Sequence, residues 1–241
     1  MLLSLRYRFL FVHIAKTGGT SVRTALSRYR YNGRYGMLAF AADKLDQLSG
    51  HRIGAKFPRH AKAIAAKEML PREVYEQLFK FVFVRNPWDL QVSSFHHIRR
   101  ERPQLMGPYH DDFEGFLRWK LDPERPYQYH IDTSIERQSD YIVDLDGNVI
   151  VDFIGRYESL NEDYQWICQR IGLANDEPLP HKRQAKDRQN DYRRYYSDAT
   201  AELVAQHFAR DIELFGYSFD GATSPKPRIE STRYVVLPAG D

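Results

Sequence analysis

Residues 9 to 24 read FLFVHIAKTGGTSVRT, a pattern that predicts how the chain folds around it. It opens with a run of apolar and β-branched residues that suits a buried parallel strand. The run ends in Lys16-Thr17-Gly18-Gly19-Thr20-Ser21 and restarts as a helical pattern. Two glycines let the turn approach a ligand closely, and the first N–H groups of the helix face the turn. The stretch therefore predicts a strand, a turn and a helix that together bind an anion.

The polar groups of this turn suit a phosphate or a sulfate. Lys16 and the hydroxyls of Thr17, Thr20 and Ser21 can donate to several oxygens at once, through bonds that are worth roughly 1.5–3 kcal/mol each when charge-assisted. The lysine stands before the glycines, whereas a Walker A loop places its lysine after them. The alternative is a structural junction whose hydroxyls are incidental.

A second junction lies at residues 79 to 97, FKFVFVRNPWDLQVSSFHH. A buried-strand run ends in Arg85, a turn that contains proline follows, and a helical pattern begins. Arg85 at the strand end and Ser93 about one turn into the helix can face the same phosphate group. The alternative for Arg85 is a structural ion pair with Asp89.

The two junctions resemble the 5′-phosphosulfate loop (PKTGTTS or PKTGGTS) and the 3′-phosphate motif (RNPWDRxVSxY) of sulfotransferases that use 3′-phosphoadenosine 5′-phosphosulfate (PAPS). Ala15, Leu90 and Phe95 stand where the family has proline, arginine and tyrosine, and none of these three positions supplies a phosphate ligand. The resemblance extends from Phe9 to Tyr217 and points to the carbohydrate and bacterial branch of the family.

The resemblance implies an α/β, P-loop-type three-layer fold with a central, mainly parallel sheet flanked by helices. Apolar runs that alternate with helical patterns also indicate an α/β sheet with crossover helices. We expect residues 1–220 to form one sulfotransferase domain. Residues 221–241 are rich in Gly, Ser and Pro, and they are expected to form a loosely packed tail.

Several further elements can be predicted from local signals. They are a first helix that continues to Tyr29, two helices between Ala61 and Phe79 with a break near Leu70, a hairpin over Tyr141–Phe153 that turns at Asp146-Gly147-Asn148, a helix closed by Gly172, a last helix from Ser197 or Asp198 to Gly216, and a possible strand at Tyr234–Leu237.

The resemblance implies PAPS as the donor and adenosine 3′,5′-bisphosphate (PAP) as the product. The 5′-phosphate group would lie at the loop from Lys16 to Ser21 and the 3′-phosphate at Arg85 and Ser93. Lys16 would act in catalysis by donating to the leaving phosphate as its charge grows. We expect no metal, because the transferred group carries one negative charge and the sequence has no HExxH, paired cysteines or Asp-rich loop.

His60 is the candidate general base, because imidazole titrates near neutral pH and this residue resembles the histidine of carbohydrate sulfotransferases such as heparan 2-O-sulfotransferases. A helix cap or a phosphate contact is the alternative. Tyr157 resembles an adenine contact, although a buried aromatic residue is equally ordinary. In the late basic segment His181–Arg188, Lys186 and Arg188 are expected to bind the nucleotide, unless the loop is simply solvated.

The irregular, aromatic-rich stretch Arg99–Arg137 suits an acceptor-binding wall. The alternative is a helical excursion at Phe113–Leu121 with its aromatic side chains packed inward. The predicted function is sulfuryl transfer to a hydroxyl acceptor, a glycan or glycolipid. Its rivals are a P-loop small-molecule kinase and a catalytically inactive nucleotide-binding protein.

The composition of the chain limits its size class, its partners and its cellular location. A chain of 241 residues with 42% hydrophobic content can bury a sizeable core, and 35 basic against 32 acidic side chains give too mild a charge to indicate nucleic-acid binding. The single cysteine, Cys168, lies on an apolar helix face and favours a reducing compartment. The first strand begins near residue 8, which leaves no room before it for an anchor of about 20 apolar residues. We therefore expect a cytoplasmic, bacterial enzyme without a transmembrane segment.

Overall fold

The computed structural model describes residues 1–30, 41, 57–173, 179 and 189–222. In this part of the chain a four-stranded sheet has the order β1 (Leu2–Ser4), β2 (Phe9–Val12), β3 (Phe79–Val84) and β4 (Phe153–Arg156). β1 pairs with β2 in antiparallel fashion, whereas β2, β3 and β4 are parallel. The prediction of a mainly parallel sheet is confirmed.

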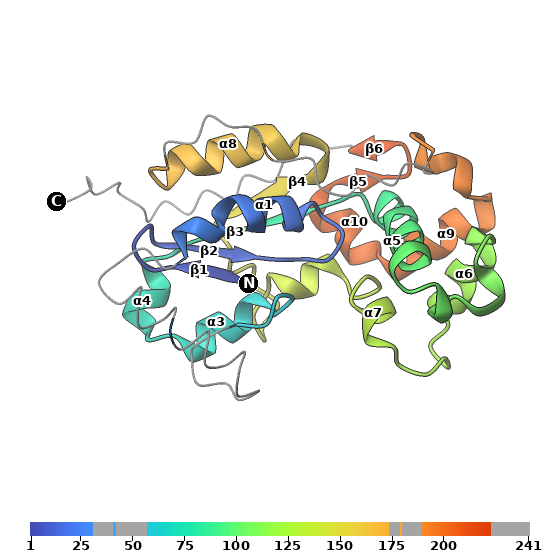
Figure 1. Cartoon of the computed structure of the whole chain (residues 1–241), viewed down its shortest axis with the longest axis horizontal. Coiled ribbons are helices and arrows are strands. Elements are labelled where there is room, and N and C mark those ends of the chain that lie inside the picture. Colours follow the sequence, from blue (N-terminus) through green and yellow to red (C-terminus); the bar gives the residue numbers. More distant parts are fainter. Residues whose placement is uncertain (31–40, 42–56, 174–178, 180–188, 223–241) are drawn as a thin grey trace.

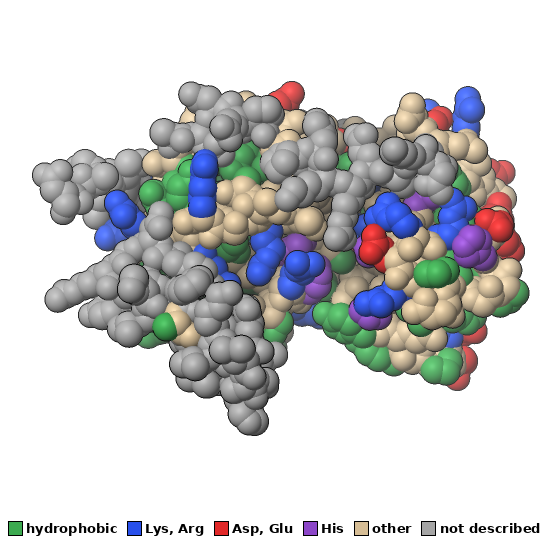
Figure 2. All heavy atoms as spheres, viewed as in Figure 1, with side chains coloured by type: hydrophobic (Ala, Val, Ile, Leu, Met, Phe, Trp, Pro, Cys, Tyr) green, Lys and Arg blue, Asp and Glu red, His purple; other side chains and the backbone are tan. Residues whose placement is uncertain are grey.

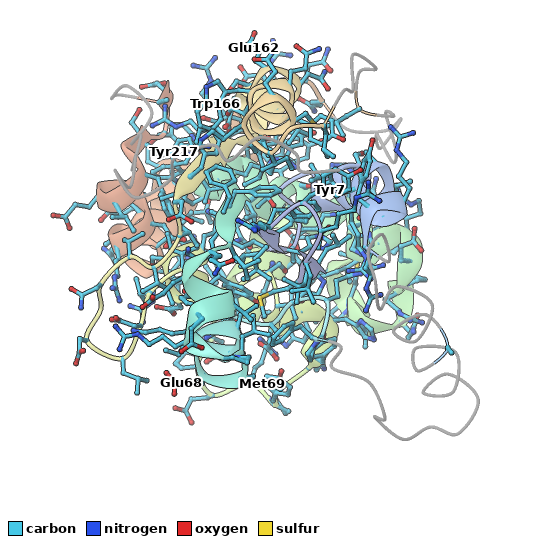
Figure 3. All side chains as sticks on the ribbon, turned by 90° about the vertical axis from the view of Figure 1, so that its left-hand side faces the viewer. Tyr7, Glu68, Met69, Glu162, Trp166 and Tyr217 are labelled. Atoms are coloured by element: carbon cyan, nitrogen blue, oxygen red, sulfur yellow. The ribbon has the colours of Figure 1, made fainter. Side chains whose placement is uncertain are left out.

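Side chains of the sheet alternate between two apolar cores. Phe9, Phe11 and Phe81 pack with α1 (Gly19–Leu26) and α8 (Leu160–Arg170), whereas Leu10 and Val82 pack on the other face with α3 (Ala63–Met69). Figure 3 shows the resulting layers, with Glu162 and Trp166 of α8 on one side of the sheet and Glu68 and Met69 of α3 on the other. The three-layer α/β fold is therefore confirmed.

A third apolar core lies beside the sheet, among α5 (Pro87–Glu101), α6 (Phe113–Lys120) and α9 (Asp198–His207), at the right of Figure 1. Phe113 and Phe116 are buried in it. The aromatic residues at the start of α6 thus pack inward, as the alternative reading of this stretch expected.

The remaining described elements are short. They are α4 (Arg72–Glu76), α7 (Tyr129–Asp132), α10 (Ala209–Phe215), β5 (Tyr217–Ser218), β6 (Gly221–Ala222) and the 3₁₀ turns Ser27–Tyr29, Pro103–Leu105, Gly107–Tyr109, Gln138–Tyr141, Tyr157–Ser159 and Tyr192–Tyr195.

Several local signals correctly predict where helices begin and end. The chain is extended at Leu70 and Pro71, which separates α3 from α4, and Gly172 and Gly216 have the positive φ values of helix ends, 69° and 63°. Ser197 caps α9. The buried Cys168 lies in α8, as predicted.

Three predictions about the elements differ from the structure. The first strand of the sheet is β1, which begins at Leu2 and not near residue 8. The hairpin is reduced to a turn with one bridge, Val143 to Val149, because the Asp144 carboxylate accepts the backbone N–H groups of Asp146 and Asn148 and Phe153 joins β4 instead. The last helix is divided at Phe208 into α9 and α10. The division lets α9 pack in the third core while α10 reaches the sheet.

The C-terminal tail stays a prediction. Gly221 and Ala222 pair with β5, and residues 223–241, including the possible strand Tyr234–Leu237, lie outside the described residues. No helix in the described part of the chain is long and apolar enough to cross a membrane.

Candidate functional site

A cavity of about 760 Å³ lies where β2 and β3 end. Because parallel strands end at the same edge of a sheet, the two predicted phosphate motifs meet there. The predicted site residues that line the cavity are Lys16, Gly18, Gly19, Thr20, Ser21, His60, Arg85, Ser93 and Tyr157.

The loop after β2 has a constrained backbone. Lys16 adopts a left-handed conformation with φ of 66°, which costs a non-glycine residue about 1–2 kcal/mol. Gly18 has φ of 79° and precedes α1, whose first turn has no side-chain cap. The Thr17 hydroxyl donates to the Ile14 carbonyl at 3.1 Å, so this buried side chain closes the turn and does not line the cavity.

Glycine is required at the start of α1 for steric reasons. A Cβ atom on Gly19 would lie 2.1 Å from Cδ2 of His13, and one on Gly18 would lie 2.6 Å from a methyl carbon of Leu160. The loop therefore packs directly on His13 and on the start of α8.

Arg85 connects the two motifs. Its Nε donates to Asp89 at 2.7 Å, its Nη1 donates to the Lys16 carbonyl at 3.0 Å, and its guanidinium carbon lies 3.8 Å from the centre of the Tyr157 ring. Burial lowers the pKa of Arg85, while Tyr157 and Glu158 oppose this effect. The ion pair with Asp89 exists, and Arg85 lines the cavity all the same.

The sequence did not indicate what supports Arg85. The Gln138 side chain accepts the Arg85 N–H at 2.9 Å and donates to the Arg85 carbonyl at 2.8 Å. Asp211 in turn accepts the backbone N–H groups of Gln138 and Ser139. These partners are far apart in the chain, so no local signal could reveal them.

His60 has a defined protonation pattern. Its Nδ1 lies 3.0 Å from the His13 carbonyl oxygen, which can only accept, so this contact assigns the proton to Nδ1 and leaves the lone pair on Nε2. Burial lowers the pKa of His60 below its ordinary value, and the charge of Arg59 acts in the same direction, while the contact with His13 opposes them. His60 is therefore a neutral imidazole at physiological pH.

The ring of His13 packs between neighbouring rings. Its ring is buried, with centroids 5.6 Å from Phe11 and 4.8 Å from His60. Burial lowers the pKa of His13 well below its ordinary value, and the charges of His60 and Arg59 add to the effect. It supports both the Gly19 loop and the His60 ring.

Comparison with known proteins agrees with this geometry. A model described as "Sulfotransferase family" matches residues 1–218. The chain belongs to the sulfotransferase family. This family uses PAPS as its sulfuryl donor, and membership argues against the kinase alternative.

Two relatives of this sulfotransferase-family chain are distant. Human "Carbohydrate sulfotransferase 9" is 24% identical over 246 residues, which cover 88% of this chain and 52% of the relative. The chain thus spans about half the length of that protein. An uncharacterized protein of Archaeoglobus fulgidus is 29% identical over 107 residues, covering 44% of this chain and 77% of the relative.

The cavity is lined mainly by positive charge, which suits the anionic donor PAPS. Four lining residues are lysine or arginine, namely Lys16, Arg59, Arg85 and Arg100, whereas among the described lining residues the one acid is Asp89, which pairs with Arg85. Figure 2 shows lysine or arginine side chains beside histidines near the middle of one face. Such a surface suits a ligand with several anionic groups.

The late basic segment His181–Arg188 lies outside the described residues. Lys186 and Arg188 lie outside the described residues, but Gln189 and Asn190, which follow directly, line the cavity. The described residues contain no group of three or more His, Cys, Asp or Glu side chains that could hold a metal ion.

The remaining lining residues were not among the individual residues predicted for the site. They are Ala15, Ser94, His96, His97, Tyr129, His130, Thr133, Ser134 and Tyr192, together with His13, Arg59 and Arg100. Tyr129 and its neighbours come from α7 and the turn after it. The stretch Arg99–Arg137 therefore divides, since the start of α6 packs inward and the region of α7 lines the cavity.

Proposed function

We propose that this chain transfers a sulfuryl group from PAPS to a hydroxyl group of a carbohydrate acceptor, a glycan or glycolipid. The observation that carries the proposal is the meeting, in one cavity, of the Lys16 loop, Arg85 with Ser93, and a neutral His60 with its lone pair on Nε2. The name of the human relative and the hydroxyl and aromatic side chains near α7 support a carbohydrate.

Different residues bind the donor, neutralise the charge of the leaving group and accept the proton. Bound PAPS would supply an activated sulfuryl group and an in-line leaving phosphate. Arg85 and Ser93 bind the 3′-phosphate, a group that does not react. Lys16 and the first N–H groups of α1 neutralise charge on the departing 5′-phosphate. Nε2 of His60 accepts the proton of the attacking hydroxyl.

Labelled sulfate transfer from PAPS to a panel of glycans tests this proposal. Transfer to at least one glycan is expected without added metal, and His60→Asn should slow single-turnover transfer by about 10²–10⁴-fold while PAP affinity is unchanged. Binding of PAP without transfer to any glycan would contradict the proposal and favour the alternative that the chain is a catalytically inactive nucleotide-binding protein. A His60→Asn rate near that of the native chain would contradict the role of His60. The cytoplasmic and bacterial location stays a prediction.

A further inference from the structure

Tyr157 lies directly against Arg85 at the wall of the cavity. The register of the sheet pairs Val84 of β3 with Arg156 of β4. Arg85 and Tyr157 are the next residues along these two parallel strands, so they lie side by side where the strands end. Both residues line the cavity. The sheet therefore places a tyrosine beside the arginine that is proposed to bind the 3′-phosphate.

The Arg85 guanidinium lies over the face of the Tyr157 ring. The guanidinium carbon is 3.8 Å from the ring centre, well inside the distance of about 6 Å at which an aromatic face attracts a cation. Arg85 is almost fully buried, so water weakens this attraction little. That face of the ring is occupied by Arg85 and is not open to an adenine base.

Two hydrogen bonds hold the same guanidinium at its nitrogens. Nε donates to Asp89 at 2.7 Å, and Nη1 donates to the Lys16 carbonyl at 3.0 Å. The ring adds a third contact, from a separate segment of the chain. These three contacts together restrict both the position and the tilt of the guanidinium.

The Tyr157 ring also packs on the loop after β2. A Cβ atom on Gly18 would lie 3.2 Å from Cδ2 of Tyr157. Gly18 belongs to the loop that is proposed to bind the 5′-phosphate, and it lines the same cavity. Tyr157 thus contacts both phosphate motifs, and its ring is held in place by both.

The residues on either side of Tyr157 are anchored to the protein. Glu158 accepts the backbone N–H of Asn86 at 3.0 Å, directly after Arg85. Asp163 of α8 accepts the backbone N–H of Arg156 at 2.8 Å. These contacts need no ligand, so the ring can orient Arg85 before a nucleotide binds.

We propose that Tyr157 is a positioning residue whose ring orients the Arg85 guanidinium for the 3′-phosphate of the donor. The inference rests on the proposed function. It gives Tyr157 a role different from the adenine contact that the resemblance implies. The ring acts on the nucleotide through Arg85 and therefore contributes to the binding of ligands that carry a 3′-phosphate.

Affinities for PAP and adenosine 5′-phosphate, measured by titration calorimetry, separate the two roles because both ligands contain adenine and only PAP has the 3′-phosphate. Tyr157→Leu should weaken PAP binding about tenfold, the scale of a desolvated cation–π contact, and leave adenosine 5′-phosphate binding unchanged. Tyr157→Phe is the matched control. It keeps the ring face and should restore most of the PAP affinity that Tyr157→Leu loses. Should Tyr157→Leu not fold, Tyr157→Met gives the same comparison.

A second measurement tests whether Tyr157 acts through Arg85. The double variant Arg85→Leu with Asp89→Leu lacks the guanidinium. Adding Tyr157→Leu to it should cause no further loss of PAP affinity, because residues that act through one contact are not additive. A direct contact between Tyr157 and the nucleotide would cause the same loss in both backgrounds.

Four outcomes would overturn the proposal: equal losses for PAP and adenosine 5′-phosphate in Tyr157→Leu, no loss for either ligand, a loss in Tyr157→Phe as large as in Tyr157→Leu, or an undiminished loss in the background without Arg85. A native chain that binds PAP no more tightly than adenosine 5′-phosphate would instead reject the proposed function itself.

Discussion

His60 shows how one contact can prepare a residue for proton transfer. The His13 carbonyl occupies Nδ1, and burial lowers the His60 pKa below its ordinary value of 6.5. A general base works in its neutral form, so the transfer rate should fall as the pH decreases through the His60 pKa. Single-turnover rates at saturating donor should therefore reach half their maximum below pH 6.5. His60→Asn should remove this acid limb. A midpoint above the ordinary value, or the same limb in His60→Asn, would assign the titration to another group.

At the same scale, residue type alone identified some groups and missed others. His60 could be predicted because few side chains titrate near neutral pH. The complete burial of Lys120 in α6 could not be predicted, because a lysine on a helix is usually solvated. Its spacing was the available signal, because it lies seven residues after Phe113 and four after Phe116, on the apolar face of α6.

The junction of β3 and α5 combines structure with binding. Arg85→Ala would leave the buried Asp89 without this partner and should lower the free energy of unfolding by about 3 kcal/mol, as well as weaken PAP binding. The double variant Arg85→Leu with Asp89→Leu removes both charges, so stability should largely return while PAP binding stays weak. Denaturant unfolding and calorimetry measure the two effects. Recovery of PAP binding in the double variant would show that Arg85 has only a structural role.

The turn between β2 and α1 depends on the fit between Gly19 and His13. Gly19→Ala brings a methyl group against the His13 ring and should cost about 1–3 kcal/mol of stability and reduce PAP affinity. His13→Ala opens space below the loop, so the double variant should be more stable than the sum of the single effects predicts. Thermal and denaturant unfolding of the four proteins measure this coupling. Simple additivity would mean that the loop does not rest on His13.

Elements defined by local signals could be predicted from the sequence, and elements decided by distant partners could not. Gly216 ends α10 as expected, because a positive φ favours glycine wherever the helix lies. The break at Phe208 depends on two separate cores, and the hairpin is shortened to one bridge because Phe153 pairs with Phe81 of β3. Neither the two cores nor β3 is encoded in the residues next to these elements.

For the whole molecule, the parallel sheet explains why two distant motifs form one site. β2 and β3 are adjacent, so the loop after each strand reaches the same cavity, and the Arg85 contact to Lys16 joins them. The order of the two motifs, each preceded by an apolar strand, was enough to predict that their loops form one site. The supports from Gln138 and Asp211, and the lining from α7, depend on how the whole chain packs.

The most direct test of this account compares PAP with adenosine 5′-phosphate by titration calorimetry in the presence of a metal chelator. The two nucleotides differ only in the 3′-phosphate, which Arg85 and Ser93 are proposed to bind. PAP should bind about a hundredfold more tightly, as two charge-assisted hydrogen bonds allow, and Ser93→Ala should reduce this advantage. Equal affinities for the two nucleotides, or PAP binding only with added magnesium, would contradict the assignment of the cavity as a PAPS site.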